Sequence, residues 1–266
     1  MNDKYIELTV KTNPDLVELL ADFIMNATGE AVEIGTDTIV LRTSESTETI
    51  EQQLKELDIE CEVSKEEKEN IDWIKAYQDS VQPIEAGEFY IHPQWHEAKE
   101  GKINILINPA LAFGSGHHAT TFSCLQAISK YVKKSDTLLD VGCGSGILAL
   151  ASTHKGAVVD LCDTDELAVD SSKENFALNG KEYNNIWVGS ANKTDKKYDV
   201  VVANIIADVL KMIANELKSK LKSNSYLIVS GILDKKEHIV TDAFSDLDII
   251  ERIQKDEWVT FIYKGQ

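Results

Sequence analysis

The spacing of hydrophobic and polar positions changes near residue 65, which divides the chain into two parts. In the first part, alternating or helix-spaced apolar residues predict strands at 5–10, 31–34, 39–41 and 59–63, with helices at 15–26 and 50–57. This order, βαββαβ, is typical of the ferredoxin-like fold. We therefore expect a small N-terminal α+β domain over residues 1–64.

A charged stretch follows this predicted domain. Residues 64–69 read Ser-Lys-Glu-Glu-Lys-Glu, and Ile71, Trp73, Ile74 and Tyr77 then recur at the spacing of a short amphipathic helix. We interpret residues 65–84 as a linker with one helix.

Strands and helices alternate over residues 85–266, which predicts a parallel sheet covered by helices on both faces. Strands are expected at 137–141, 157–162, 186–188, 198–203 and 225–230. Two further strands, at 248–252 and 258–263, are separated by a polar turn and predict a hairpin. The expected fold class is therefore α/β, with a doubly wound, seven-stranded, Rossmann-like sheet.

A glycine loop joins the first of these sheet strands to a helix. Asp140 opens it, and Gly142, Gly144 and Gly146 follow at every second position before the apolar run 147–151. Glycines let the backbone approach a ligand closely, and the N–H groups of the new helix point at it. A dinucleotide fingerprint has its third glycine three residues after the second, whereas here the interval is two. This pattern is typical of S-adenosylmethionine (SAM) methyltransferases, and the alternative is an ordinary turn in an α/β sheet.

Other polar residues stand where the predicted strands end, which is the ligand-binding edge of a doubly wound sheet. Asp163 ends its strand about 20 residues after the glycines and is the expected ribose ligand. Ser190 and Asn204 follow two further strands. Asp165 and Glu166 are explained as the cap and first turn of the next helix.

Asn204 has two interpretations. It stands at the tip of an apolar strand, but it lacks the Pro-Pro-aromatic context of enzymes that methylate bases or side-chain amides, so a flexible amine is the favoured acceptor. The alternative is a helix cap before Ala207.

Composition limits the possible classes of partner. The 45 acidic and 27 basic residues give a net charge of -18, which disfavours direct nucleic-acid binding and suits either a basic partner or simply a soluble surface. No secretion signal or apolar run of membrane-spanning length is present, so a cytoplasmic protein is expected. The four cysteines form no C-x-x-C pair, and we expect them reduced and mostly buried, with no metal site.

The segment 108–121 reads NPALAFGSGHHATT, and here the chain closely resembles the ribosomal protein L11 methyltransferase (PrmA) family. The resemblance extends through 140–150, 202–207, 230–233 and 257–258, and it fits Asp72 and Trp73 of the linker. The N-terminal domain matches by architecture more than by motif. His117 and Ala119 depart from the residues of many members, often Thr and Pro, which puts the rigidity of this loop in question.

The resemblance implies SAM as cofactor, with Thr121, Gly142, Asp163 and Asn204 in contact with it, and with Phe113 and His118 lining the same pocket. Phe113, His118 and Asn204 would form the catalytic set, in which His118 is a candidate proton acceptor and water is the alternative.

The implied reaction is methyl transfer to lysine side-chain or N-terminal amines of ribosomal protein L11, free or in the large subunit. The N-terminal domain would recognise this substrate. Two alternatives stay open: a methyltransferase of another protein lysine or of a small amine, and a non-catalytic SAM-binding module associated with the ribosome.

Overall fold

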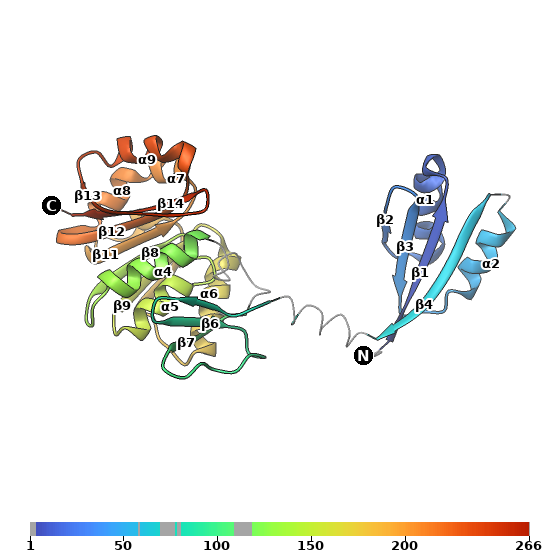
Figure 1. Cartoon of the computed structure of the whole chain (residues 1–266), viewed down its shortest axis with the longest axis horizontal. Coiled ribbons are helices and arrows are strands. Elements are labelled where there is room, and N and C mark those ends of the chain that lie inside the picture. Colours follow the sequence, from blue (N-terminus) through green and yellow to red (C-terminus); the bar gives the residue numbers. More distant parts are fainter. Residues whose placement is uncertain (1–3, 58, 70–77, 79–80, 109–118, 266) are drawn as a thin grey trace. The chain divides into compact units, whose positions relative to one another are not determined.

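The chain forms two compact units, residues 1–80 and 81–266 (Figure 1). The computed structural model describes residues 4–57, 59–69, 78, 81–108 and 119–265. The expected linker helix around 71–77 therefore lies outside the described residues, as does the segment with Phe113 and His118.

The N-terminal unit has the predicted order of elements. They are β1 (Lys4–Thr12), α1 (Val17–Thr28), β2 (Val32–Ile34), β3 (Thr38–Thr43), α2 (Glu48–Glu56) and β4 (Cys61–Glu69). The sheet order is β2-β3-β1-β4, which is the ferredoxin-like arrangement. Apolar residues of both helices pack with those of β1 and β3 in a single core, because the strands alternate between a buried and an exposed face.

Strand β4 extends five residues beyond the predicted domain boundary at residue 64. It pairs with β1 along its whole length, as far as Lys4 opposite Glu69. Its charged side chains make cross-strand ion pairs, such as Lys68 with Glu7 and Lys4 with Glu67. An edge strand exposes side chains to solvent and often carries charges, so the charge run that indicated a connector belongs to a strand.

The second unit is built on a seven-stranded sheet, as predicted. Its strands are β8 (Thr137–Val141), β9 (Val158–Asp163), β10 (Asn185–Val188), β11 (Tyr198–Asn204), β12 (Leu221–Leu233), β13 (Asp248–Lys255) and β14 (Trp258–Lys264). The order β10-β9-β8-β11-β12-β14-β13 places the first five parallel and ends in the expected antiparallel hairpin. The strand order reverses between β8 and β11, which is the switch point where such sheets bind ligands.

Helices cover both faces of this sheet. The helices α4 (Ala119–Tyr131), α5 (Ile147–His154) and α6 (Glu166–Leu178) pack on one face, and α7 (Ala207–Met212), α8 (Ala214–Ser219) and α9 (Glu237–Ala243) pack on the other. Neighbouring residues such as Leu138 and Leu139 belong to opposite cores, because successive side chains of a strand point to opposite faces.

A small three-stranded sheet precedes α4, and the sequence did not predict it. It consists of β5 (Ile84–Ala86), β6 (Phe89–His92) and β7 (Ile103–Leu106), with β6 and β7 parallel. Phe89, Ile91 and Ile105 join the core beneath α4 and α5. These strands have only three or four residues each, too few to show a clear alternation in the sequence.

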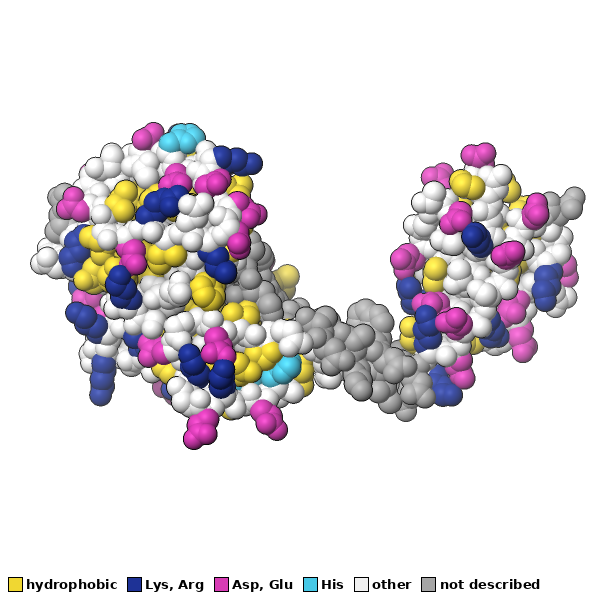
Figure 2. All heavy atoms as spheres, in the orientation of Figure 1, with side chains coloured by type: hydrophobic (Ala, Val, Ile, Leu, Met, Phe, Trp, Pro, Cys, Tyr) yellow, Lys and Arg dark blue, Asp and Glu magenta, His cyan; other side chains and the backbone are white. Residues whose placement is uncertain are grey.

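Figure 2 shows acidic and basic side chains interspersed on the visible face of each unit. All four cysteines are free, and three are buried, as expected, whereas Cys61 is partly exposed. Within the described ranges, no helix combines the length and apolarity needed to cross a membrane.

Candidate functional site

The glycine loop has the backbone geometry of a cradle. Gly142, Gly144 and Gly146 all have positive φ angles, of 74°, 54° and 76°. A Cβ atom at Gly142 would lie 2.6 Å from Cγ2 of Ile205, and one at Gly146 would lie 2.9 Å from Oγ of Ser172. Side chains at these positions would therefore be strained and would collide with the tip of β11 or with α6.

Asp140 lies beneath this loop and is only 1% exposed. Its Oδ2 accepts a hydrogen bond from the Ala149 N–H at 3.1 Å, whereas its Oδ1 has no partner among the described residues. Burial raises the pKa of this carboxyl to about 7, although the Ala149 N–H acts in the opposite direction. A buried carboxyl oxygen without a partner is well suited to a donor or cationic group of a ligand.

Asp163 ends β9 and connects two loops. Its Oδ2 accepts from the Gly144 N–H at 2.9 Å and its Oδ1 from the Asp165 N–H at 3.1 Å. The carboxylate is therefore held against the glycine loop. Asp165 itself caps α6 by accepting from the Leu167 N–H at 2.9 Å, as the sequence predicted.

Asn204 is not a helix cap. Helix α7 begins at Ala207 with Ile206 as its N-cap, and no side chain makes the capping bond. The Asn204 Nδ2 instead donates to Oγ1 of Thr121 at 3.3 Å, which links the tip of β11 to the first turn of α4. The alternative interpretation of Asn204 is therefore wrong.

The backbone next to Asn204 is fixed by β12. Ile205 N–H donates to the Ser230 carbonyl at 3.1 Å. Gly231 has a φ of 85°, and a Cβ there would lie 2.4 Å from the Ile205 carbonyl oxygen. Only glycine lets the two strand tips approach this closely.

These strand tips surround a cavity of about 530 Å³. Five of the residues expected from the sequence to bind the cofactor line it: Gly142, Gly144, Asp163, Ser190 and Asn204. Thr121 is joined to it through Asn204, while Asp140 and Gly146 lie in the strand and loop at its edge. The other walls are mostly apolar, from Val141, Leu167, Ala168, Ile205, Val209, Met212 and Ile213, together with Thr164, Asp165 and Gly189. Apolar walls with a few converging polar groups are typical of cofactor sites.

Glu216 of α8 holds one wall of this cavity, and sequence reasoning missed it. Its Oε1 accepts from the Ser190 hydroxyl and, at 2.6 Å, from the Asn192 N–H. The Trp187 Nε1 adds a bond to the Ser190 carbonyl at 2.9 Å. The loop after β10 is thus fixed from behind. Glu216 lies 26 positions from Ser190 in the chain, within a short helix. Nothing in the sequence distinguishes it from a glutamate that simply faces solvent.

Phe113 and His118, two of the three expected catalytic residues, lie outside the described residues. Among the residues that the structure does describe, no group of three His, Cys, Asp or Glu side chains could hold a metal ion. The described residues at the cofactor cavity offer carboxylate, amide and backbone N–H groups.

Comparisons with known proteins agree with this architecture. The family model described as ribosomal protein L11 methyltransferase (PrmA) matches residues 36–266. A ribosomal protein L11 methyltransferase from a Nitratiruptor species is 48% identical over 275 residues, covering 100% of this chain and 98% of that protein. Another, from Campylobacter concisus, is 44% identical, with 99% of both chains covered. The crystal structure of a ribosomal protein L11 methylase from Lactobacillus delbrueckii subsp. bulgaricus superposes with a TM-score of 0.66 and 29% identity, covering 70% of this chain and all of that one.

Proposed function

Since the chain belongs to the ribosomal protein L11 methyltransferase family, we propose that it transfers methyl groups from SAM to lysine side-chain or N-terminal amines of ribosomal protein L11. The observation that carries this proposal is the meeting of Gly142, Asp163 and Asn204 at one cavity. These three residues come from three separate strand ends at the switch point of the sheet. An excess of 18 negative charges suits a basic protein better than a nucleic acid as the partner.

The residues present fit SAM as cofactor. When bound, SAM supplies a methyl group activated by its sulfonium. Gly142 and Gly144 leave room for close approach, Asp163 offers oxygens to ribose hydroxyls, and Asp140 has a buried oxygen available for a cationic group. Thr121 reaches the site through Asn204, and Ser190 lines the wall held by Glu216.

The remaining task is to align and deprotonate an amine. Because the Asn204 Nδ2 donates to Thr121, its Oδ1 is oriented as the acceptor for an amine N–H. Making a lysine neutral at pH 7 costs about 4.6 kcal/mol, and burial near a cationic centre lowers this cost. In this proposal, which follows the family resemblance, His118 accepts the proton and Phe113 has the role of lining the pocket. An unchanged pH–rate profile after His118→Ala would assign the proton to water instead.

The test is to mix the purified protein with labelled SAM and ribosomal protein L11 from the same cell, free or in the large subunit, and to map the methyl groups by mass spectrometry. We expect methylated lysine or a methylated N-terminal amine. Asn204→Ala should lower kcat about 100-fold, because a positioned hydrogen-bonding group at the reacting amine is lost. The matched control is Asn215→Ala, at an exposed amide on α8.

The outcomes separate the possible functions. SAM binding with transfer to another protein or to a small amine would change the substrate and leave the enzyme class intact. SAM binding without any transfer would favour a non-catalytic module.

A further inference from the structure

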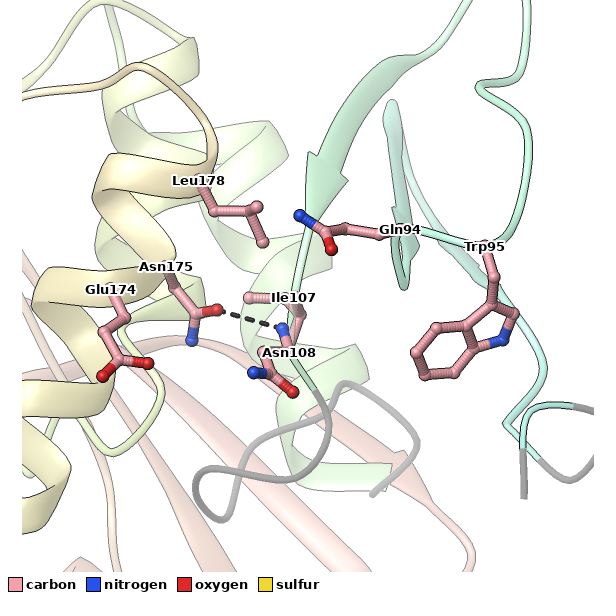
Figure 3. A pocket seen from close by; sticks show the side chains of 7 residues that line it. All are labelled: Gln94, Trp95, Ile107, Asn108, Glu174, Asn175 and Leu178. Atoms are coloured by element: carbon pink, nitrogen blue, oxygen red, sulfur yellow. Dashed lines mark hydrogen bonds between the residues drawn. The ribbon is translucent and has the colours of Figure 1, made fainter. Parts of the chain in front are cut away.

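A second cavity of about 330 Å³ lies within residues 81–266, and it shares no lining residue with the cofactor cavity. It lies between the chain around β6 and β7 and the outer side of α6 (Figure 3). Its walls are formed by Gln94, Trp95, Ile107, Asn108, Glu174, Asn175 and Leu178. None of its lining residues belongs to the glycine loop or to the strand tips of the cofactor site.

The chemistry of these walls suits a long cationic side chain. Figure 3 shows the Trp95 indole on one side of the cavity and the Glu174 carboxylate on the other, with Ile107 and Leu178 between them. Glu174 is the only charged residue among the lining residues, and no cationic side chain pairs with it in the described part of the chain. An aromatic ring and a carboxylate both attract a cation, while the apolar residues can pack against a methylene stem.

The cavity is also mechanically connected to the cofactor site. Asn175 is fully buried, and its Oδ1 accepts from the Asn108 N–H at 3.0 Å while its Nδ2 donates to the Ser145 carbonyl at 2.9 Å. Ser145 belongs to the glycine loop. Next to it, Asn179 makes a similar pair of bonds with the backbone of Leu106, at 2.9 and 2.8 Å. Asn175 in α6 and Asn179 at its C-cap thus fix the end of β7 and the chain that follows it relative to the glycine loop.

We propose that this cavity binds a lysine or arginine side chain of the protein substrate, at a position other than the amine that is methylated. The inference rests on the proposed function, because it assumes a protein as the substrate. The net charge of -18 favours a cationic partner, and Glu174 supplies a specific anchor for it. Because Asn175 bonds both Asn108 and the glycine loop, a substrate side chain bound in this cavity would have a fixed position relative to the cofactor site.

The first test uses the full chain with ribosomal protein L11 at saturating SAM. Glu174→Gln should raise KM for L11 about tenfold, which corresponds to about 1.4 kcal/mol, with kcat and SAM affinity unchanged. Glu174→Lys should raise KM further. Because the Glu174 side chain is exposed, neither substitution disturbs the hydrophobic core. Glu182→Gln is the matched control, because it removes one exposed carboxylate that lines neither cavity. Equal KM values for Glu174→Gln and Glu182→Gln would overturn the inference.

A second measurement does not depend on L11. Pentalysine is titrated into the protein while the indole N–H signal of Trp95 is followed by NMR, with the signal assigned by its loss in Trp95→Phe. We expect a saturable shift, with the dissociation constant raised about tenfold by Glu174→Gln. A Trp95 signal that pentalysine leaves unmoved would contradict the cavity's role. If pentalysine binds but L11 is not methylated, the proposed substrate fails and the cationic site stands.

Discussion

Ile205 is the residue at which the parts of the cofactor site come together. Its N–H donates to the Ser230 carbonyl of β12. Its Cγ2 lies 2.6 Å from where a Cβ of Gly142 would stand, and its carbonyl oxygen lies 2.4 Å from where a Cβ of Gly231 would stand. Two glycines therefore make room for one isoleucine next to Asn204. The resemblance included these residues, but the sequence alone could not show that they touch, because they lie far apart in the chain.

Gly231→Ala should damage activity more than stability alone would explain. The new methyl group would collide with the Ile205 backbone at a φ of 85°, so the adjacent Asn204 should shift. We expect a loss of about 1–3 kcal/mol in the free energy of unfolding and a lower kcat. Gly180→Ala is the control, because Gly180 has a φ of 57° with nothing within 4 Å of an added Cβ. Urea unfolding and initial rates measure both effects, and similar kcat values for the two variants would contradict this role of Gly231.

Asp140 should make the stability of the cofactor-free protein depend on pH. Its pKa is raised from 3.8 to about 7 in the folded state, so between these values the folded chain binds more protons than the unfolded one. Its contribution to the free energy of unfolding therefore falls as pH rises from about 4 to 7, by at most about 1.4 kcal/mol per pH unit. Asp140→Asn removes this fall and should be more stable than the wild type above pH 7, but should bind SAM more weakly.

Urea unfolding from pH 4 to 8.5 tests this prediction. The exposed Asp242→Asn change is the control and should leave the pH dependence of the wild type unaltered. Parallel pH profiles for Asp140→Asn and the wild type would show that burial does not hold this carboxyl in its neutral form.

At the scale of elements, the sequence predicted the large sheet well because its strands have strong signals. Strands β9 and β11 are mainly apolar runs that end in Asp163 and Asn204, and β8 is a short apolar run with Asp140 next to its end. Strands β13 and β14 are separated by a polar turn. Two features were missed for physical reasons. Strands β5 to β7 are too short for a period to show, and the charges that mark β4 as an exposed edge are the same charges that mark a connector.

The short helix α8 should act on the affinity for SAM through the loop after β10. Glu216→Ala removes the acceptor shared by Ser190 and Asn192, so the loop loses two hydrogen bonds. We expect the KM for SAM to rise about tenfold with little change in kcat. Glu216→Gln keeps an oxygen at the accepting position and should restore most of the affinity.

Calorimetric binding of SAM and initial rates distinguish this positioning role from a general loss of stability. Asn215→Ala, on the same helix, is the control and should behave as the wild type. A Glu216→Gln variant as weak in SAM binding as Glu216→Ala would show that the negative charge, and not the two hydrogen bonds, is what matters.

At the scale of the whole molecule, the division into two units with separate cores makes their roles separable. The apolar residues of the N-terminal unit form one cluster, and those of the catalytic unit form two others. The cofactor cavity lies entirely within residues 81–266. All of its described lining residues belong to the second unit, and we propose that the N-terminal unit recognises the protein substrate.

Removing residues 1–80 should leave SAM affinity within about twofold of the wild type, but should lower kcat/KM for L11 about 100-fold, because tethering a second binding module raises the effective concentration of a substrate by such factors. A cut at residue 64 would divide β4 and leave five strand residues without their partner, so residue 80 is the better end point. SAM titration and methylation of L11 by the 81–266 fragment measure the two quantities separately. Full methylation by the fragment would assign the N-terminal unit another role, whereas loss of SAM binding would show that the catalytic unit depends on it for its fold.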